Sequence, residues 1–291
     1  MAVDKFIRDP LWATLVGALV AAMGVSFFVF VQSGEAAPQA ADEQTTYASV
    51  SPLIVGGTAV PNGKYPFMAY VELYGKGKSV WACGGTLIDR DSVLTAAHCL
   101  KNTTGAVVAV GRTDLKEKNR GQEIGASRPF IHPRYNGNGY DAGVLKLRRA
   151  VKGIKPIKLA TAKQNNLEKP GRILTAAGWG VRKQRKVRSD ISPKRMREVS
   201  VPVVSDSRAK RAYQSQDPKY LPSLQVAAGK KGKSPCFGDS GGPLFDSGSR
   251  TQVGITSHGA VQKCGTARYP GVYTEVNNPN IRNFILAAAK R

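Results

Sequence analysis

Two hydrophobic patterns divide the chain. Residues 11–31 form an apolar run without a charged side chain, whereas short apolar runs alternate with Gly, Pro, Asn and Asp from residue 54 onward. A helix as long as the first run rises about 1.5 Å per residue, enough to span the roughly 30 Å hydrocarbon core of a bilayer. Residues 34–53, rich in Ala, Ser, Thr, Gln and Pro, predict a linker or pro-segment without its own core.

Charges beside the apolar run predict its orientation. Lys5 and Arg8 precede it, and the next basic side chain after it is Lys64. Basic flanks stay in the cytoplasm, so the amino end is expected inside and the remainder exported. Residues 1–33 therefore form a signal anchor held in the membrane through 11–31, or a signal peptide cleaved near the small residues around Gly34. The remainder is then anchored to the outer face of the cytoplasmic membrane or secreted.

Short strands dominate the exported part. Runs of β-type residues at 79–88, 106–111, 173–178 and 252–258 are separated by turn residues, which predicts an all-β barrel or sandwich. One helix is predicted at the end of the chain, where Asn278 can cap it and Pro279 suits the first turn. Its apolar face is formed by Ile281, Phe284, Ile285 and Ala288.

The cysteines indicate disulfides rather than a metal site. There are four of them, Cys83, Cys99, Cys236 and Cys264, and an even number in an exported domain favours two disulfides. Their spacing leaves all three connectivities open. The sequence contains no Cys-x-x-Cys pair and no histidines at metal-ligand spacing, so neither a metal nor another cofactor is expected.

The net charge of the chain is +23, which favours an anionic partner such as nucleic acid, a membrane or wall surface, or an acidic glycan. Residues 54–291 hold 41 basic and 15 acidic side chains and therefore carry +26. The densest segment, 182–197, contains Arg182, Lys183, Arg185, Lys186, Arg188, Lys194, Arg195 and Arg197. Export and the lack of stacking aromatics argue against nucleic acid. A solvated loop and a tether to an anionic surface or polymer remain as alternatives.

Three segments carry candidate chemistry. Ser240 lies among the glycines of residues 238–242, where backbone N–H groups can point at one spot, although a plain surface turn also fits. His98 follows small apolar residues and fits a buried structural histidine, while Asp141 fits a turn residue. Taken together, the three supply a nucleophile, a base and an orienting carboxylate.

Seven motifs in order make residues 54–291 resemble the trypsin/chymotrypsin-like serine proteases along nearly their whole length. The motifs are Ile54-Val55-Gly56-Gly57, Thr95-Ala96-Ala97-His98-Cys99, the Asp141 segment, Gly178-Trp179-Gly180, Gly238-Asp239-Ser240-Gly241-Gly242-Pro243, Ser257-His258-Gly259 and Pro270-Gly271-Val272-Tyr273. The resemblance implies two antiparallel six-stranded β-barrels, about 54–165 and 166–277, and a terminal helix at about 278–290. It also implies the disulfides Cys83–Cys99 and Cys236–Cys264.

The resemblance assigns roles to the candidate residues of a serine endopeptidase that acts on polypeptides. Ser240 is implied as the nucleophile, His98 as the general base, and Asp141 as the carboxylate that orients the imidazole. The N–H groups of Gly238 and Ser240 are implied as the oxyanion hole. Ser257 is implied to support Asp141.

Ile54 and Asp239 form a second implied pair. In the family, cleavage before this Ile creates an α-amino group that inserts beside the Asp and orders the oxyanion hole and pocket. The chain therefore resembles a zymogen. The residue before the cut is Leu53 rather than Lys or Arg, so we expect that a trypsin does not activate it.

The specificity pocket is implied to be uncharged and open. Ser234 matches the position at its base, and Gly259 and Gly271 match its walls, which predicts cleavage after large apolar residues such as Phe, Tyr, Leu or Met. Elastase-like and trypsin-like specificities remain as alternatives. His258 stands where the family usually has Trp. A catalytically inactive cationic binding protein on the same fold is the rival function, and the presence of all three triad residues argues against it.

Overall fold

The computed structural model describes residues 54–77, 79–180, 194–260 and 264–291. The predicted signal or anchor at 1–33, the linker at 34–53 with Leu53, and most of the basic segment 182–197 lie outside the described residues. Among the residues described, no helix is both long and apolar enough to cross a membrane.

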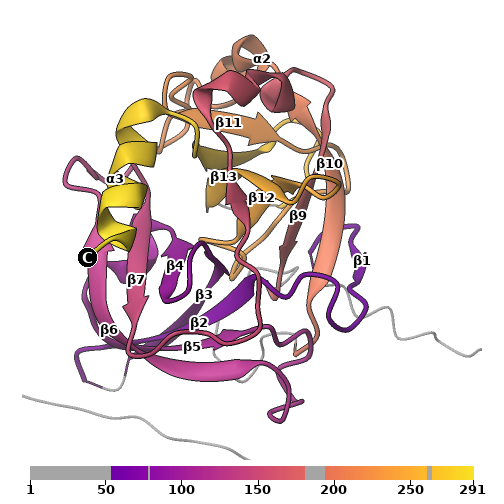
Figure 1. Cartoon of the computed structure of the whole chain (residues 1–291). Coiled ribbons are helices and arrows are strands. Elements are labelled where there is room, and N and C mark those ends of the chain that lie inside the picture. The colour runs from indigo at the N-terminus through magenta and orange to yellow at the C-terminus, as the bar shows by residue number, and fades with distance from the viewer. Residues whose placement is uncertain (1–53, 78, 181–193, 261–263) are drawn as a thin grey trace, which may run out of the picture. The chain divides into compact units, whose positions relative to one another are not determined.

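Six antiparallel strands close the first barrel in the order β2-β3-β4-β7-β6-β5 (Figure 1). They are β2 (Met68–Gly75), β3 (Val80–Leu87), β4 (Ser92–Thr95), β5 (Thr103–Val110), β6 (Gln122–Ile131) and β7 (Gly143–Leu147). The interior is filled by fully buried aliphatic side chains from facing strands, among them Val71, Leu87 and Val144. Burial of this branched apolar core stabilises the barrel.

Six further strands close the second barrel, because β9 pairs with β10 as well as with β12. They are β9 (Ile173–Gly178), β10 (Arg197–Val204), β11 (Gln225–Ala228), β12 (Pro243–Asp246), β13 (Thr251–His258) and β14 (Gly271–Glu275). Leu174, Val201, Leu244 and Tyr273 fill this core. The predicted all-β fold of two antiparallel six-stranded barrels is confirmed.

The first residues of the domain pack on the second barrel rather than on the first. Strand β1 (Thr58–Ala59) pairs with β10, and Ile54 is buried in the core of the second barrel. Strand β8 (Lys158–Leu159) likewise pairs in parallel with β13. Both short strands therefore pair with a strand that is distant in sequence.

The predicted terminal helix is α3 (Pro279–Ala289), which follows the second barrel and packs on the first. The Asn278 side chain accepts hydrogen bonds from two backbone N–H groups of the first turn, and Pro279 occupies that turn. Ile281, Ile285 and Ala288 are buried in the first barrel's core, whereas Phe284 is only partly buried against it. The helix therefore joins the two barrels.

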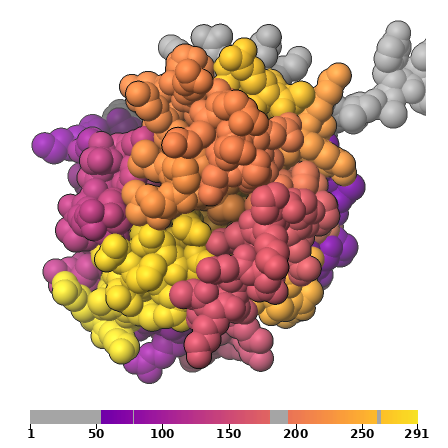
Figure 2. All heavy atoms as spheres, turned by 90° about the horizontal axis from the view of Figure 1, so that it is seen from above, coloured from indigo at the N-terminus to yellow at the C-terminus, as the bar shows by residue number. Residues whose placement is uncertain are grey.

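In the described part of the chain, three shorter helices interrupt the strands: α1 (Ala97–Leu100), the 3₁₀ helix η1 (Ala162–Glu168) and α2 (Asp206–Ala212). Seen from above, Figure 2 shows the yellow C-terminal helix, the orange chain around α2 and the rose chain around η1 on one face. Arg282 of α3 donates to the Ala160 carbonyl at 3.1 Å, which ties the helix to the segment before η1.

Both disulfides have the pairing that the resemblance implied. Cys83 is bonded to Cys99 and ties β3 to α1, the helix that carries His98. Cys236 is bonded to Cys264 and ties the Ser240 loop to the chain that follows β13. Each disulfide therefore restrains a segment that carries candidate chemistry.

Candidate active site

A chain of hydrogen bonds joins His98, Asp141 and Ser257. His98 lies in α1, and Asp141 lies on the turn before β7. Asp141 Oδ1 accepts the backbone N–H of His98 at 2.9 Å, and its Oδ2 lies 2.7 Å from His98 Nδ1. The Ser257 hydroxyl, on β13, donates to the same Oδ2 at 2.7 Å. The first barrel thus supplies His98 and Asp141, and the second barrel supplies Ser257.

Burial and charge set the protonation of this chain. Asp141 is only 2% exposed, and burial by itself raises its pKa, but attraction to His98 and hydrogen bonds from His98 and Ser257 hold that pKa below the ordinary range. Burial lowers the pKa of His98, and the charge of Asp141 outweighs this effect and raises it. The Asp141 carboxylate therefore stabilises the protonated form of the His98 imidazole.

The loop that carries Ser240 packs directly against the segment leading to His98. The Gly84 N–H of β3 donates to the Ser240 carbonyl at 2.7 Å, and the Thr95 hydroxyl donates to the Gly84 carbonyl at 2.8 Å. Gly241 adopts φ +78°, and a Cβ there would collide with Thr95 Oγ1. Only glycine allows this approach, which explains the glycines beside the serine.

The Ser240 hydroxyl and the His98 imidazole are not hydrogen-bonded within the described residues. His98 Nε2 lies 3.7 Å from Cys99 Sγ, a sulfur held in the Cys83–Cys99 disulfide and therefore not a thiolate ligand. Catalytic hydrogen bonds often tighten only when substrate is bound.

Two backbone donors near Ser240 have no partner among the described residues: the N–H groups of Gly238 and Ser240. Gly238 adopts φ +89°, a left-handed conformation that glycine adopts without strain. Both residues are partly exposed. Unpaired N–H groups at a solvent-accessible turn can stabilise a developing oxyanion.

Asp239, between these two donors, points inward. It is 1% exposed and accepts the N–H groups of Gly180 and Cys236, each at 2.8 Å. Burial raises its pKa to about 7, and the two backbone hydrogen bonds only partly offset this effect. Ile54 is also 1% exposed and lies in the core of the same barrel. Both members of the predicted activation pair are therefore buried.

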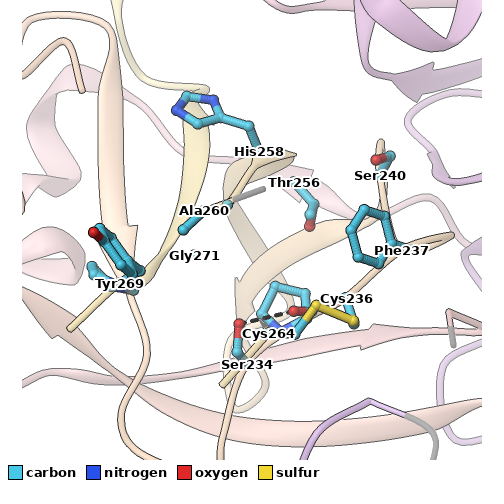
Figure 3. A pocket seen from close by; sticks show the side chains of 13 residues that line it. Ser234, Cys236, Phe237, Ser240, Thr256, His258, Ala260, Cys264, Tyr269 and Gly271 are labelled. Atoms are coloured by element: carbon cyan, nitrogen blue, oxygen red, sulfur yellow. Dashed lines mark hydrogen bonds between the residues drawn. A yellow bond between two sulfur atoms is a disulfide. The ribbon is translucent and has the colours of Figure 1, made fainter. Parts of the chain in front are cut away.

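A cavity of about 110 Å³ opens beside Ser240 (Figure 3). Ser234, Gly259 and Gly271, which the resemblance implied for the specificity pocket, all line this cavity. Figure 3 shows Ser240 and Phe237 on one side, Ala260 and Tyr269 on the other, and Ser234 near the disulfide. The Ser234 hydroxyl donates to the Pro235 carbonyl at 2.8 Å, and no lining side chain among the described residues carries a formal charge at neutral pH.

Sequence reasoning missed several of the lining residues. They are Pro235, Phe237, Thr256, Ala260, Tyr269 and Pro270. All of them lie within or beside the motifs of the Ser240, Ser257 and Gly271 segments, so proximity to a motif is the signal that would have found them.

His258 also lines the cavity and is uncharged at neutral pH. Burial lowers its pKa to about 4. Its ring stands edge-on to Tyr213 with 5.7 Å between centroids, and its Nε2 is buried without a hydrogen-bond partner among the described residues. The ring therefore contributes an apolar face and one unsatisfied polar atom to this side of the cavity.

Comparison with known proteins identifies the class to which this fold and site belong. The sequence profile of the Trypsin family matches residues 54–285. A trypsin-like protease of Streptomyces glaucescens is 33% identical over 233 residues, covering 77% of this chain and 78% of its own. Granzyme H of Homo sapiens is 34% identical over 242 residues, covering 80% and 90%. The solved structure of HL collagenase superposes with a TM-score of 0.70 at 25% identity, covering 82% and 99%.

The chain therefore belongs to the trypsin family. It is a serine endopeptidase, and its substrates are polypeptides.

Proposed function

We propose that this protein cleaves polypeptides after large apolar residues, through an acyl-enzyme formed on Ser240. The observation that carries the proposal is the uncharged cavity beside Ser240, next to the hydrogen-bonded chain of His98, Asp141 and Ser257. The rival, a catalytically inactive cationic binding protein, has no comparable observation in its favour.

The proposed reaction has two halves. Ser240 Oγ attacks the scissile carbonyl while His98 Nε2 takes its proton, and Asp141 stabilises the imidazolium that forms. The N–H groups of Gly238 and Ser240 bind the oxyanion, and removing one such donor typically costs about 10²–10³ in rate. The imidazolium then protonates the leaving amine. Water, deprotonated by His98, hydrolyses the ester and restores Ser240.

The proposed specificity follows from the lining of the cavity. Ser234 carries no charge and its hydroxyl is already bonded to Pro235, so a substrate Arg or Lys would bury a cation without a counter-charge. Gly259 has open space where a Cβ would stand, and Gly271 adds no side chain to the cavity wall. These features support a large apolar side chain over a basic one and over the small side chains of elastase-like substrates.

We further propose that the chain is a zymogen cut between Leu53 and Ile54. The buried Asp239 carboxylate, with its raised pKa, would gain a cationic partner from the new α-amino group. Leu53 follows Pro52 and would itself fit an apolar pocket, so the enzyme is proposed to activate itself. A purified Ser240→Ala chain should remain uncut, and processing of that variant without added protease would contradict self-activation.

The proposed location is outside the cell. The two disulfides support an oxidising compartment. Anchoring through 11–31 and attachment to an anionic surface or polymer through 182–197 are proposed on sequence grounds alone. Fractionation of expressing cells tests the anchor: the intact chain should be in the membrane fraction, and recovery of the soluble domain in the medium would instead identify a cleaved signal.

A cleavage profile on a peptide library, with protein that begins at Ile54, tests the proposed activity. We expect cleavage after Phe, Tyr, Leu and Met, and a dominant Arg or Lys preference would overturn the assignment of the pocket. An organophosphonate should label Ser240 in the cut protein but not in the Ser240→Ala control. A correctly cut and folded protein that resists labelling would favour the binding-protein alternative.

A further inference from the structure

A second hollow on the molecule, of about 500 Å³, is lined by residues that the proposed mechanism does not use. It lies on the second barrel, beside β1, β9 and β10 and the turn between β12 and β13. Its cationic side chains are Lys64, Lys233 and Arg250, and the hydroxyl residues Thr58, Ser200 and Ser247 also line it. We call this hollow the cationic groove.

The electrostatic balance of the cationic groove is positive. Glu198 is the acidic residue in its lining, and its two carboxylate oxygens are already bound to the Lys64 ammonium and the Tyr65 hydroxyl, each at 2.5 Å. Within the described residues, neither the Lys233 ammonium nor the Arg250 guanidinium has an acidic partner. Two cations therefore face the groove without a counter-charge.

The backbone under both cations is held in place. Lys230 and Lys233 exchange two backbone hydrogen bonds, at 3.1 and 2.9 Å, so the turn that presents Lys233 is closed. The Arg250 carbonyl accepts the N–H of Lys158 at 3.1 Å, which ties its turn to β8. Binding of an anion here would therefore cost little backbone conformational entropy.

Several polar groups of the groove lining are available to a ligand. Among the described residues, the hydroxyls of Thr58, Ser200 and Ser247 make no hydrogen bond to protein, and all three residues are exposed. The apolar contribution is small, because Val199 and Tyr65 are almost wholly buried. An acidic peptide would draw much of its affinity from apolar pockets, which this lining provides only sparsely. An anionic sugar chain can instead pair its charged groups with the cations and hydrogen-bond to the exposed hydroxyls.

We propose that the cationic groove binds an anionic oligosaccharide. Lys233 and Arg250 would pair with its sulfate, phosphate or carboxylate groups, and the hydroxyls of Thr58, Ser200 and Ser247 would hydrogen-bond to the sugar. The ligand would lie outside the cavity beside Ser240. The proposal does not depend on the cleavage specificity, and it concerns residues other than the basic segment 182–197.

Binding of a labelled, sulfated heparin-type hexasaccharide to the full-length protein tests the proposal by fluorescence anisotropy at physiological salt. The double variant Lys233→Ser/Arg250→Ser should raise the Kd at least about tenfold, because two charge-assisted contacts are lost. The matched control Lys210→Ser/Arg211→Ser removes two exposed charges from α2 and should change the Kd less than about twofold. Equal losses in the two variants, or no loss in either, would overturn the groove assignment.

A second measurement separates a glycan from any other polyanion. Polyglutamate of the same charge should compete poorly with the hexasaccharide, and Ser200→Ala should weaken hexasaccharide binding about threefold while leaving polyglutamate binding unchanged. Equal competition by polyglutamate would mean that the groove binds charge alone, and the glycan assignment would then be wrong. Near-UV circular dichroism of each variant confirms that the fold is retained.

Discussion

Ser257 donates its hydroxyl proton to Asp141 Oδ2 at 2.7 Å, although the two residues are 116 positions apart and lie in different barrels. The same oxygen lies 2.7 Å from His98 Nδ1. The carboxylate that orients the candidate base is therefore itself oriented from the opposite barrel. The position of the imidazole depends on the packing of one barrel against the other.

Ser257→Ala should lower kcat by about three- to thirtyfold. A hydrogen bond to a charged group contributes about 1.5–3 kcal/mol, and its loss leaves Asp141 more basic. The imidazole would then hold its proton more tightly, so the acid limb of the kcat/KM profile should move to higher pH. The measurement is a pH–rate profile on one peptide substrate. Lower activity with an unmoved profile would mean that Ser257 acts through folding alone.

Tyr273→Phe should alter discrimination between substrates with Tyr and Phe before the scissile bond. The Tyr273 hydroxyl is fully buried and has no hydrogen-bond partner among the described residues, and it lies 3.3 Å from where a Cβ on Gly271 would stand. A substrate phenol reaching this wall would satisfy that hydroxyl. We expect the Tyr-over-Phe ratio of kcat/KM to fall about three- to tenfold in the variant. An unchanged ratio would place the hydroxyl beyond reach of the substrate.

Asp239→Asn should make the stability of the uncut chain less dependent on pH and should lower the activity of the cut protein. Burial raises the pKa of Asp239 to about 7 from an ordinary 3.8, so its contribution to the stability of the uncut chain is full below about pH 4 and is lost as the pH rises toward 7. In the uncut chain, the free energy of unfolding of the variant should therefore fall less between pH 4 and pH 7 than that of the parent. Urea denaturation at the two pH values measures this difference. In the cut protein, it should lower kcat/KM at least about a hundredfold. Full activity of the variant after the cut would show that Asp239 is not needed for activation.

Glu168→Gln should increase the free energy of unfolding of the protein at alkaline pH. Burial, with the neighbouring Glu275, raises the pKa of Glu168 to about 9 from an ordinary 4.5, so its stabilising contribution is full below about pH 4.5 and is lost as the pH rises toward 9. The neutral amide can still accept the hydrogen bond that Asn277 Nδ2 donates to Glu168 Oε2 at 3.0 Å. The variant should therefore gain roughly 1–2 kcal/mol over the parent at pH 9 and little at pH 5. Thermal unfolding at the two pH values measures the difference, and an equal shift at both would exclude a titration effect.

Much of the local structure follows from the sequence by itself. The strands near 79–88 and 173–178 and the terminal helix depend on side-chain periodicity and on an Asn-Pro cap, which act over a few residues. The motifs around His98, Asp141 and Ser240 are equally local. They predict the class of the protein because, with four further motifs in the same order, they resemble those of the trypsin/chymotrypsin-like serine proteases.

The tertiary structure decided which distant segments meet. Strand β1 joins the second barrel, α3 buries its apolar face in the first, and Ser257 reaches Asp141 across the two barrels. The cationic groove likewise gathers residues from β1 to the turn after β12. No local pattern contains this information, because barrel closure and side-chain packing select partners by fit in three dimensions and not by separation along the chain.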